Sequence, residues 1–140
     1  MALTDYSSLE QEIMNTPEPK ILAAGTTTKM RIISVRTGTS DKNGAKWFSP
    51  SFDVPEDPTV MEFNSFFWDP IDNDKLSPKQ KFKNNNMFKD FIAAFGINLS
   101  RPINFEEDLI GLEGWGIVGV QKSEEYGDQN TVKKFVAGRR

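Results

Sequence analysis

Three short stretches of the sequence carry aromatic residues that could form a binding surface. Trp47 directly follows Lys46, Phe66 and Trp68 are two residues apart, and Trp115 stands between two glycines. Flat rings can stack on nucleobases, at about 1–3 kcal/mol per base, while lysine and arginine side chains contact phosphates. The residues predicted to contact nucleic acid are Lys29, Arg31, Arg36, Lys42, Lys46, Trp47, Phe66, Trp68, Trp115, Lys122, Tyr126 and Lys133, with Lys134 as a further phosphate contact.

Each of these rings also has a purely structural explanation. Trp47 could cover the end of a barrel or pack under the N-terminal segment, and Trp115 could cover a bend in its own strand. Phe66 and Trp68 could be buried beneath a helix or in a subunit interface, since the acidic turn at 69–75 would repel phosphate. A single lysine or arginine is more often a solvated surface charge than a ligand contact.

Several kinds of catalysis are excluded by the residue types that the sequence lacks. It has no histidine and no cysteine, which removes Ser-His-Asp and Cys-His catalysis, HExxH metal sites, disulfides and thiolate metal sites. Gly114, Gly116 and Gly119 match a GxGxxG pattern, but no helix is expected after them, so a dinucleotide cofactor is not predicted. We predict no cofactor, no metal and no catalytic residue.

Carboxylates leave one enzymatic alternative open. Asp72, Asp74 and the acidic triplet at 106–108 could together hold magnesium in a carboxylate-dependent nuclease. A solvated turn is the simpler explanation of the triplet, and we therefore expect a protein that is not an enzyme.

The net charge of −3 opposes nucleic-acid binding, but its distribution along the chain does not. Residues 26–54 and 77–100 each carry a net charge of +3, whereas residues 1–25 and 55–76 carry −3 and −5. Positive charge therefore gathers on the first two predicted strands and on the predicted helix. The helix lysines are expected to be solvated, at the other end of the fold from the ligand.

Apolar periodicity predicts a first strand over 26–35 and a third strand over 59–68. In the first strand the alternation shifts at Ile32 and Ile33, which a β-bulge would explain. A polar loop at 37–44 follows it. In the third strand, the residues expected to face the core are Met61, Phe63 and Phe67.

The second strand, over 46–54, has the clearest alternation in the sequence. Phe48 and Phe52 fall on the face expected to be buried, and Trp47 falls on the other face with polar residues. Pro50 in the middle of the strand favours an edge position or a bulge, because proline cannot donate to a ladder.

A single helix is predicted after the third strand. Ser77, Pro78 and Gln80 supply an N-cap, a proline at the first helical position and a capping-box glutamine, and Gly96 is the expected stop. Three asparagines at 84–86 weaken its first half, so the helix could form two pieces. The residues of its predicted buried stripe are Phe88, Phe91, Ile92 and Phe95.

Two last strands, over 112–122 and 131–136, complete an all-β fold with one helix in the order β-β-β-α-β-β. That order is the arrangement of the OB-fold, a five-stranded, partly open barrel. We assign residues 1–24 to a polar N-terminal extension, in which 6–14 could form a short helix. Residues 25–137 are assigned to an OB-fold domain that binds single-stranded DNA.

The sequence over about residues 22–136 resembles small phage-encoded single-stranded DNA-binding proteins. The resemblance implies an OB-fold that coats single-stranded DNA during replication or recombination. It does not extend to the acidic C-terminal tail common in bacterial proteins of this function, so recruitment of partners by such a tail is not expected. The residues that carry the resemblance are Ala24-Gly25, Lys42-Asn43-Gly44, Gly114-Trp115-Gly116, Tyr126-Gly127, Asn130 and Val132, and the chain ends in Gly138-Arg139-Arg140.

These observations predict binding of single-stranded DNA with little sequence preference, which would protect exposed strands in phage replication or recombination. Affinity should fall with salt because phosphate contacts release counterions. RNA stays open as a ligand, since stacking accepts either polymer. Replication or recombination proteins are the expected partners, and a homo-oligomer would add phosphate contacts.

The main alternative is a β-barrel protein-interaction or virion-associated module, in which Phe66, Trp68 and Trp115 form the partner interface. No apolar run approaches the roughly 18 residues of a membrane span, and no signal-peptide pattern is present. The predicted location is therefore cytoplasmic, in the host cytoplasm for a phage-encoded protein.

Overall fold

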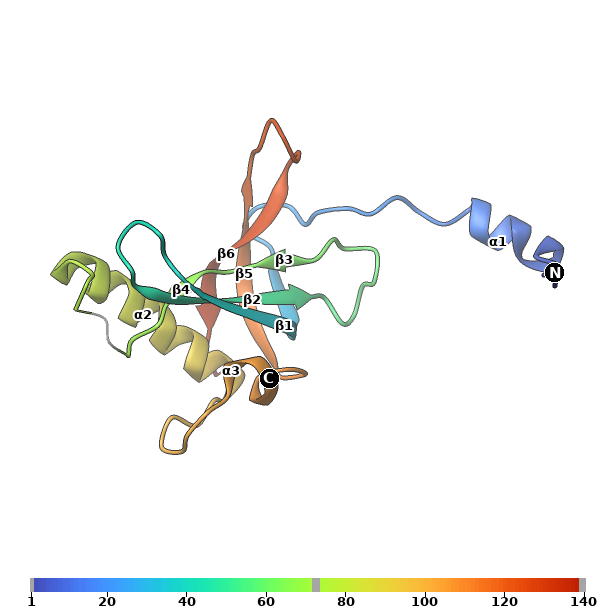
Figure 1. Cartoon of the computed structure of the whole chain (residues 1–140). Coiled ribbons are helices and arrows are strands. Elements are labelled where there is room, and N and C mark those ends of the chain that lie inside the picture. The colour runs from blue at the N-terminus through green and yellow to red at the C-terminus, as the bar shows by residue number, and fades with distance from the viewer. Residues whose placement is uncertain (1, 72–73, 139–140) are drawn as a thin grey trace.

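The computed structural model describes residues 2–71 and 74–138 (Figure 1). Within them the sheet has six antiparallel strands in the order β3-β2-β1-β5-β6, with β4 also paired to β2. Asp72, considered above for a magnesium site, and the terminal residues 139 and 140 lie outside the described residues. The elements are η1 (Ser7–Leu9), α1 (Glu10–Met14), β1 (Thr27–Thr39), β2 (Lys46–Asp53), β3 (Phe63–Asn64), β4 (Phe67–Trp68), α2 (Pro78–Phe95), α3 (Phe105–Asp108), β5 (Glu113–Gln121) and β6 (Gln129–Val136).

The long strand β1 joins the two halves of the sheet. Its residues 27–31 pair with β5, and its residues 31–39 pair with β2. The register against β2 shifts between Ile32 and Ser34, so the predicted β-bulge is confirmed. β1 also extends into the residues predicted as a loop, because its pairing with β2 continues to Thr39 opposite Lys46.

Pro50 lies at the centre of β2, which is an interior strand between β1 and the β3–β4 side of the sheet. The register on either side places Pro50 opposite Ser65, whose N–H donates to the Pro50 carbonyl over 3.0 Å. Proline has no N–H to return this bond, and the Ser49 hydroxyl donates to the Ser65 carbonyl instead, over 2.6 Å. The predicted edge position or bulge at Pro50 is therefore wrong. The missing donor instead interrupts the third strand, which divides into β3 and β4.

The residues just before β3 do not follow the predicted alternation. Val60 is buried and Met61 is 43% exposed, although the sequence predicts Met61 in the core with Phe63 and Phe67. The cause is a parallel bridge between Lys20 and Val60, in which the Met61 N–H donates to the Lys20 carbonyl over 2.8 Å. This bridge bends the chain just before β3, so the alternation of inward and outward side chains begins only with β3. Phe63 and Phe67 are buried as predicted.

α2 begins and ends where the sequence predicts. The Ser77 hydroxyl accepts from the Gln80 N–H, and the Gln80 side chain accepts from the Ser77 N–H, which completes the capping box. Gly96 ends the helix in the left-handed region with φ of 66°. The asparagines at 84–86 do not divide the helix, which is continuous. No helix in the described ranges is both long and apolar enough to cross a membrane.

The buried side of α2 packs on the inner face of the sheet. The ring centroid of Phe91 lies 5.0 Å from that of Phe67 on β4 and 5.2 Å from that of Phe135 on β6. Gly114 on β5 permits this approach, since a Cβ atom there would lie 2.7 Å from the Ala94 carbonyl oxygen. The predicted stripe is buried except for the half-buried Ile92, and its members are Phe88, Phe91, Ile92 and Phe95.

β3 and β6 lie at the two ends of the strand order, yet they approach each other. Some of their Cα atoms come within 8 Å. Phe63, Asn64, Gln129 and Asn130 line a hollow of about 230 Å³ between the two strands. No strand pairing joins β3 to β6 among the described residues. The sheet is therefore curved upon itself and open along this seam.

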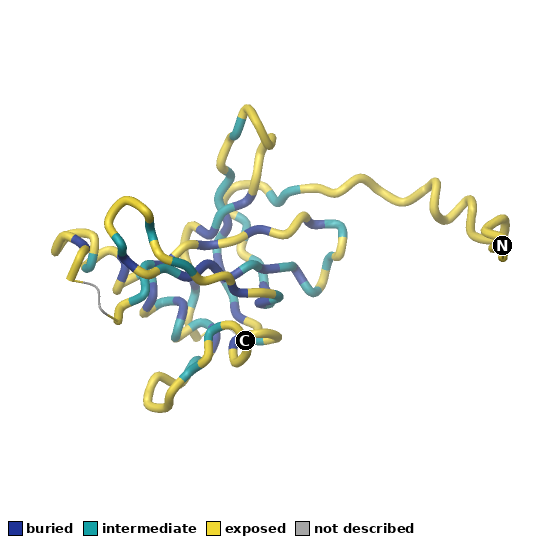
Figure 2. Tube along the Cα trace, viewed as in Figure 1, coloured by how far each residue is buried: buried dark blue, intermediate teal, exposed yellow. Residues whose placement is uncertain are grey.

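Residues 2–19 project away from the sheet, and every one of them is exposed (Figure 2). They include η1 and α1, which lie within the short helix predicted over 6–14. The polar N-terminal extension expected from the sequence is thus a protruding segment with a short helix near its tip (Figure 1).

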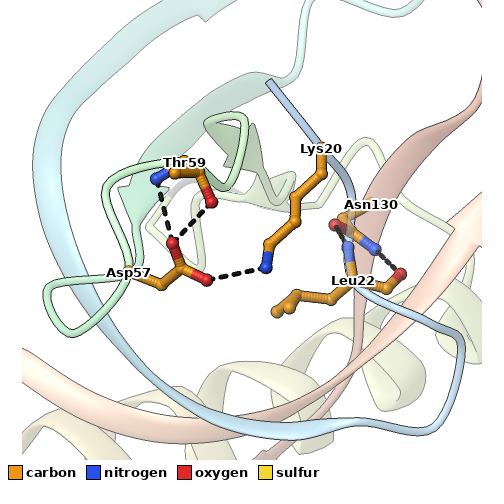
Figure 3. A network of polar contacts seen from close by, with 5 residues as sticks. All are labelled: Lys20, Leu22, Asp57, Thr59 and Asn130. Atoms are coloured by element: carbon orange, nitrogen blue, oxygen red, sulfur yellow. Dashed lines mark hydrogen bonds and ion pairs between the residues drawn. The ribbon is translucent and has the colours of Figure 1, made fainter. Parts of the chain in front are cut away.

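The chain is fastened to the sheet where this segment ends (Figure 3). Lys20 Nζ lies 3.0 Å from Asp57 Oδ2, and the Leu22 N–H and carbonyl both bond the Asn130 side-chain amide. Hydrogen bonds from Thr59 and then from Lys20 lower the pKa of Asp57 to about 2. Asp57 therefore stays charged through neutral and mildly acidic pH, and the ion pair persists with it.

Replacing Ser49 with alanine should lower the free energy of unfolding by about 1–3 kcal/mol, because the buried Ser65 carbonyl then loses its donor. Adding Pro50→Ala supplies a backbone N–H opposite that carbonyl, so the S49A/P50A variant should recover part of the loss. Urea unfolding measures the free energy of unfolding of both variants. Ser51→Ala is the matched control, since it removes a half-buried hydroxyl from the same face of β2. Equal stability of S49A and S49A/P50A would contradict this account.

Candidate nucleic-acid interface

Trp47 lies on the outer face of β2, as its phase in the sequence predicts. Its half-buried indole covers Gly38 on β1, which pairs with it across the ladder. A Cβ atom at Gly38 would lie 2.5 Å from Cζ2 of Trp47. The absence of a side chain at Gly38 is therefore what allows the ring to lie against the sheet.

Phe66 and Trp68 extend the aromatic surface that Trp47 begins. The ring centroids of Trp47 and Phe66 are 5.7 Å apart, and those of Phe66 and Trp68 are 5.0 Å apart in an edge-to-face arrangement. Phe66 is 47% exposed, and Trp68 is half-buried. We call these three residues the aromatic strip. They were predicted separately from the sequence, and the structure brings them together.

A groove of about 460 Å³ runs beside the strip. It combines two aromatic rings with a cation and with side chains that can donate and accept hydrogen bonds. These residues come from β1, β2, β3, β5 and β6 and from the segment between β3 and β4. A smaller hollow of about 250 Å³ continues from Phe66 and Trp68 onto Lys83 and Met87 of α2. The residues that line the groove include Arg36, Trp47, Asn64, Phe66, Gln121 and Thr131.

Asn84 holds Trp68 in place, and the sequence gives little sign of it. Its side chain is buried on α2, where it accepts from the Trp68 N–H over 2.8 Å and donates to the Trp68 carbonyl over 2.7 Å. These two bonds satisfy backbone groups of the short strand β4 that pair with no strand within the described residues. An asparagine that weakens the helix locally thus fixes one end of the aromatic strip.

The predicted arginines are in different electrostatic environments. Arg36 is exposed at the groove, and no ion pair joins it to an acid within the part of the chain that the structure describes. Arg31 forms a two-point ion pair with Asp53, with Nε–Oδ1 of 3.1 Å and Nη2–Oδ2 of 2.5 Å. The hydrogen bonds that Arg31 donates to Asp53 raise the pKa of Arg31 above its usual value. Arg36 is therefore the better phosphate contact, since the charge of Arg31 is already balanced.

Trp115 belongs to a second patch on the outer face, at the other half of β1. Lys29 Nζ lies 5.9 Å from the centroid of the Trp115 ring and 3.8 Å from Glu113 Oε1. Trp115 is half-buried between the buried Gly114 and Gly116, so its side chain lies on the outer face of β5, a phase that the sequence alone leaves open. The patch shares no residue with the groove.

The remaining predicted contacts lie on two loops and on the strands β2 and β6. Lys42 lies in the β1–β2 loop, and Lys122 and Tyr126 lie in the β5–β6 turn, where Tyr126 is 69% exposed. Figure 1 shows that this loop and this turn both project beyond the sheet. Lys46 and Lys133 are exposed on β2 and β6. All five are accessible, and none of them lines the groove.

The acidic triplet at 106–108 forms α3 in place of the expected turn. Glu106 Oε1 accepts from the Thr37 hydroxyl over 2.7 Å, and Asp108 Oδ2 accepts from the Asn104 N–H over 2.9 Å. No group of three or more acidic residues in 2–71 and 74–138 is placed to hold a metal ion. The triplet thus caps a short helix and contacts β1.

The groove also contains residues that the sequence analysis did not select. Asn64, Gln121 and Thr131 are outward residues of three strands, and their amide and hydroxyl groups could contact bases. Their phase is readable from the sequence, but their proximity depends on the curvature of the sheet.

The chain matches no known protein-family model and no curated protein.

Asn84→Ala should lower the free energy of unfolding by about 1–3 kcal/mol, because the Trp68 N–H and carbonyl lose their partners. The neighbouring Asn85→Ala is the control: Asn85 is exposed, and alanine favours a helix by a few tenths of a kcal/mol. Thermal unfolding followed by tryptophan fluorescence measures both variants. An N84A protein as stable as N85A would show that the amide does not hold β4.

Proposed function

We propose that this chain is an OB-fold protein that binds single-stranded DNA with little sequence preference and protects exposed strands in phage replication or recombination. One observation carries the proposal. Three aromatic rings, Trp47, Phe66 and Trp68, form a continuous strip on the outer face of the sheet, beside Arg36 in a polar groove. Stacking on aromatic rings together with phosphate contacts is how proteins bind single strands without reading their sequence.

The topology supports the OB-fold part of the proposal. With β3 and β4 counted as one interrupted strand, β1 lies between the second and fourth strands, and the last strand, β6, approaches the third. α2 lies between the third and fourth strands in the sequence. In an OB-fold, ligands lie on strands two and three and on the loops that join strands one to two and four to five. Here the aromatic strip lies on β2, on β4 and on Phe66 just before β4.

In the proposed complex, bases stack on Phe66 and Trp47, and the backbone follows cations on either side. Arg36 contacts a phosphate at the groove, and Lys42 and Lys122 contact phosphates further along the strand from their loops. Asn64 and Gln121 offer amide groups, which can pair with any base and so give little selectivity. The role in phage replication or recombination is supported by the sequence resemblance described above.

Trp47→Ala and Phe66→Ala should each weaken binding to a dT oligonucleotide by roughly 5- to 150-fold, the equivalent of about 1–3 kcal/mol for one lost stack. Saturable quenching of tryptophan fluorescence in the unmodified protein, and fluorescence anisotropy of a labelled oligonucleotide in the variants, measure this. Leu99→Ala is the control, since Leu99 is 56% exposed and lies outside the groove.

If neither quenching nor a change in anisotropy occurs at low salt, nucleic-acid binding is wrong. The aromatic strip would then be a partner interface of a protein-interaction or virion-associated module, the alternative that its apolar surface also suits.

Arg36→Gln should reduce the salt dependence of binding by about 0.7 in the slope of log K against log salt concentration, the value for one phosphate contact on a single strand. Arg31→Gln should change that slope much less, because Asp53 already balances the charge of Arg31. Affinities measured across a salt series test both variants. Equal slopes for R36Q and R31Q would show that the groove does not hold the DNA backbone.

A further inference from the structure

The protruding N-terminal segment, residues 2–19, presents an apolar face that nothing in the described chain covers. Among the helices and strands that the structure describes, α1 contacts only η1. Tyr6, Ile13 and Met14 are 62%, 52% and 77% exposed, and they line an apolar hollow of about 240 Å³. With Leu9, which is 45% exposed, Tyr6 and Ile13 recur at three- and four-residue spacing. Apolar side chains at this spacing usually pack on another surface.

The same segment is acidic. Its only charged side chains are Asp5, Glu10, Glu12 and Glu18, so residues 2–19 carry a net charge of −4. A surface that receives this segment should therefore be basic and should carry a protruding apolar side chain. An anionic lipid surface or a nucleic acid would repel it.

The outer face of α2 has both properties. Phe82 is 70% exposed, on the side of the helix away from the buried phenylalanines. Lys79, Asn86 and Lys89 are exposed beside it, three residues before Phe82 and four and seven residues after it. The sequence predicts these lysines to be solvated charges, and that prediction does not explain the exposed phenylalanine among them.

The segment is placed to reach another molecule rather than its own α2. It is fastened to the sheet at Lys20, by the ion pair with Asp57 and by the bridge to Val60. Residues 15–19, which connect this point to α1, span at most about 18 Å when extended. Figure 1 shows α1 and α2 on opposite sides of the sheet. Docking within one chain would require the segment to pass around the sheet.

We propose that the N-terminal segment of one copy docks on the outer face of α2 of a second copy. Phe82 enters the hollow of Tyr6, Ile13 and Met14, and the lysines of α2 lie opposite the acids of the segment. The two docking surfaces differ, so the contact is heterologous, and each copy can use both at once. Repetition of this contact builds an open chain of molecules. The contact requires no nucleic acid.

Sedimentation velocity of the full-length protein without DNA tests the proposal. Association should increase with protein concentration and weaken with salt. Phe82→Ser should weaken it by about tenfold or more, as expected for a central aromatic contact. Glu10→Lys/Glu12→Lys and Lys79→Glu/Lys89→Glu should each weaken it, and the four substitutions combined should restore it. This restoration cannot come from a loss of folding.

Glu124→Lys/Glu125→Lys is the control, with the same change of charge on the exposed β5–β6 turn, and it should leave association unchanged. A monomer at every concentration and at low salt would overturn the proposal, whatever the affinity for DNA. So would failure of the combined charge exchange to restore association. If the lysine variant lost only DNA affinity, α2 would be a nucleic-acid contact and the proposed docking would be wrong.

Discussion

The contact between α2 and the inner face of the sheet determines most of this structure. Phe91 packs against Phe67 from β4 and Phe135 from β6, which are far apart in the strand order. A single helix thus draws the two ends of the sheet towards each other. Because side chains alternate between the two faces of a strand, burying Phe48 and Phe67 directs Trp47 and Trp68 outward. The outer aromatic surface is a consequence of the inner one.

Pro50 adds a second constraint, which acts through the backbone. No backbone N–H lies opposite the Ser65 carbonyl, so the pairing of β2 with the third strand is interrupted next to Phe66. The Ser49 side chain donates to this carbonyl instead. The free-energy cost of the interruption is small, because β2 keeps the same register against β3 and against β4. It leaves Phe66 as the most exposed ring of the strip.

Local rules predicted much of the fold. The capping box at Ser77, the stop at Gly96 and the bulge near Ile32 each depend on neighbouring residues, and all three are confirmed. Features that depend on distant partners were missed. The sequence predicts an edge position or a bulge at Pro50, because the alignment of Pro50 with Ser65 is not readable from either segment alone.

The candidate site also combines features that depend on neighbouring residues with features that depend on distant partners. The outward phase of the aromatic strip follows from alternation along single strands. The pairing of Arg31 with Asp53 and the hold of Asn84 on Trp68 depend on register and on helix docking. Gly38 has a further consequence. The orientation of the Trp47 indole depends on the absence of a methyl group at Gly38 on the neighbouring strand. A substitution at Gly38 can therefore change the aromatic surface during evolution without replacing any atom that would touch a ligand.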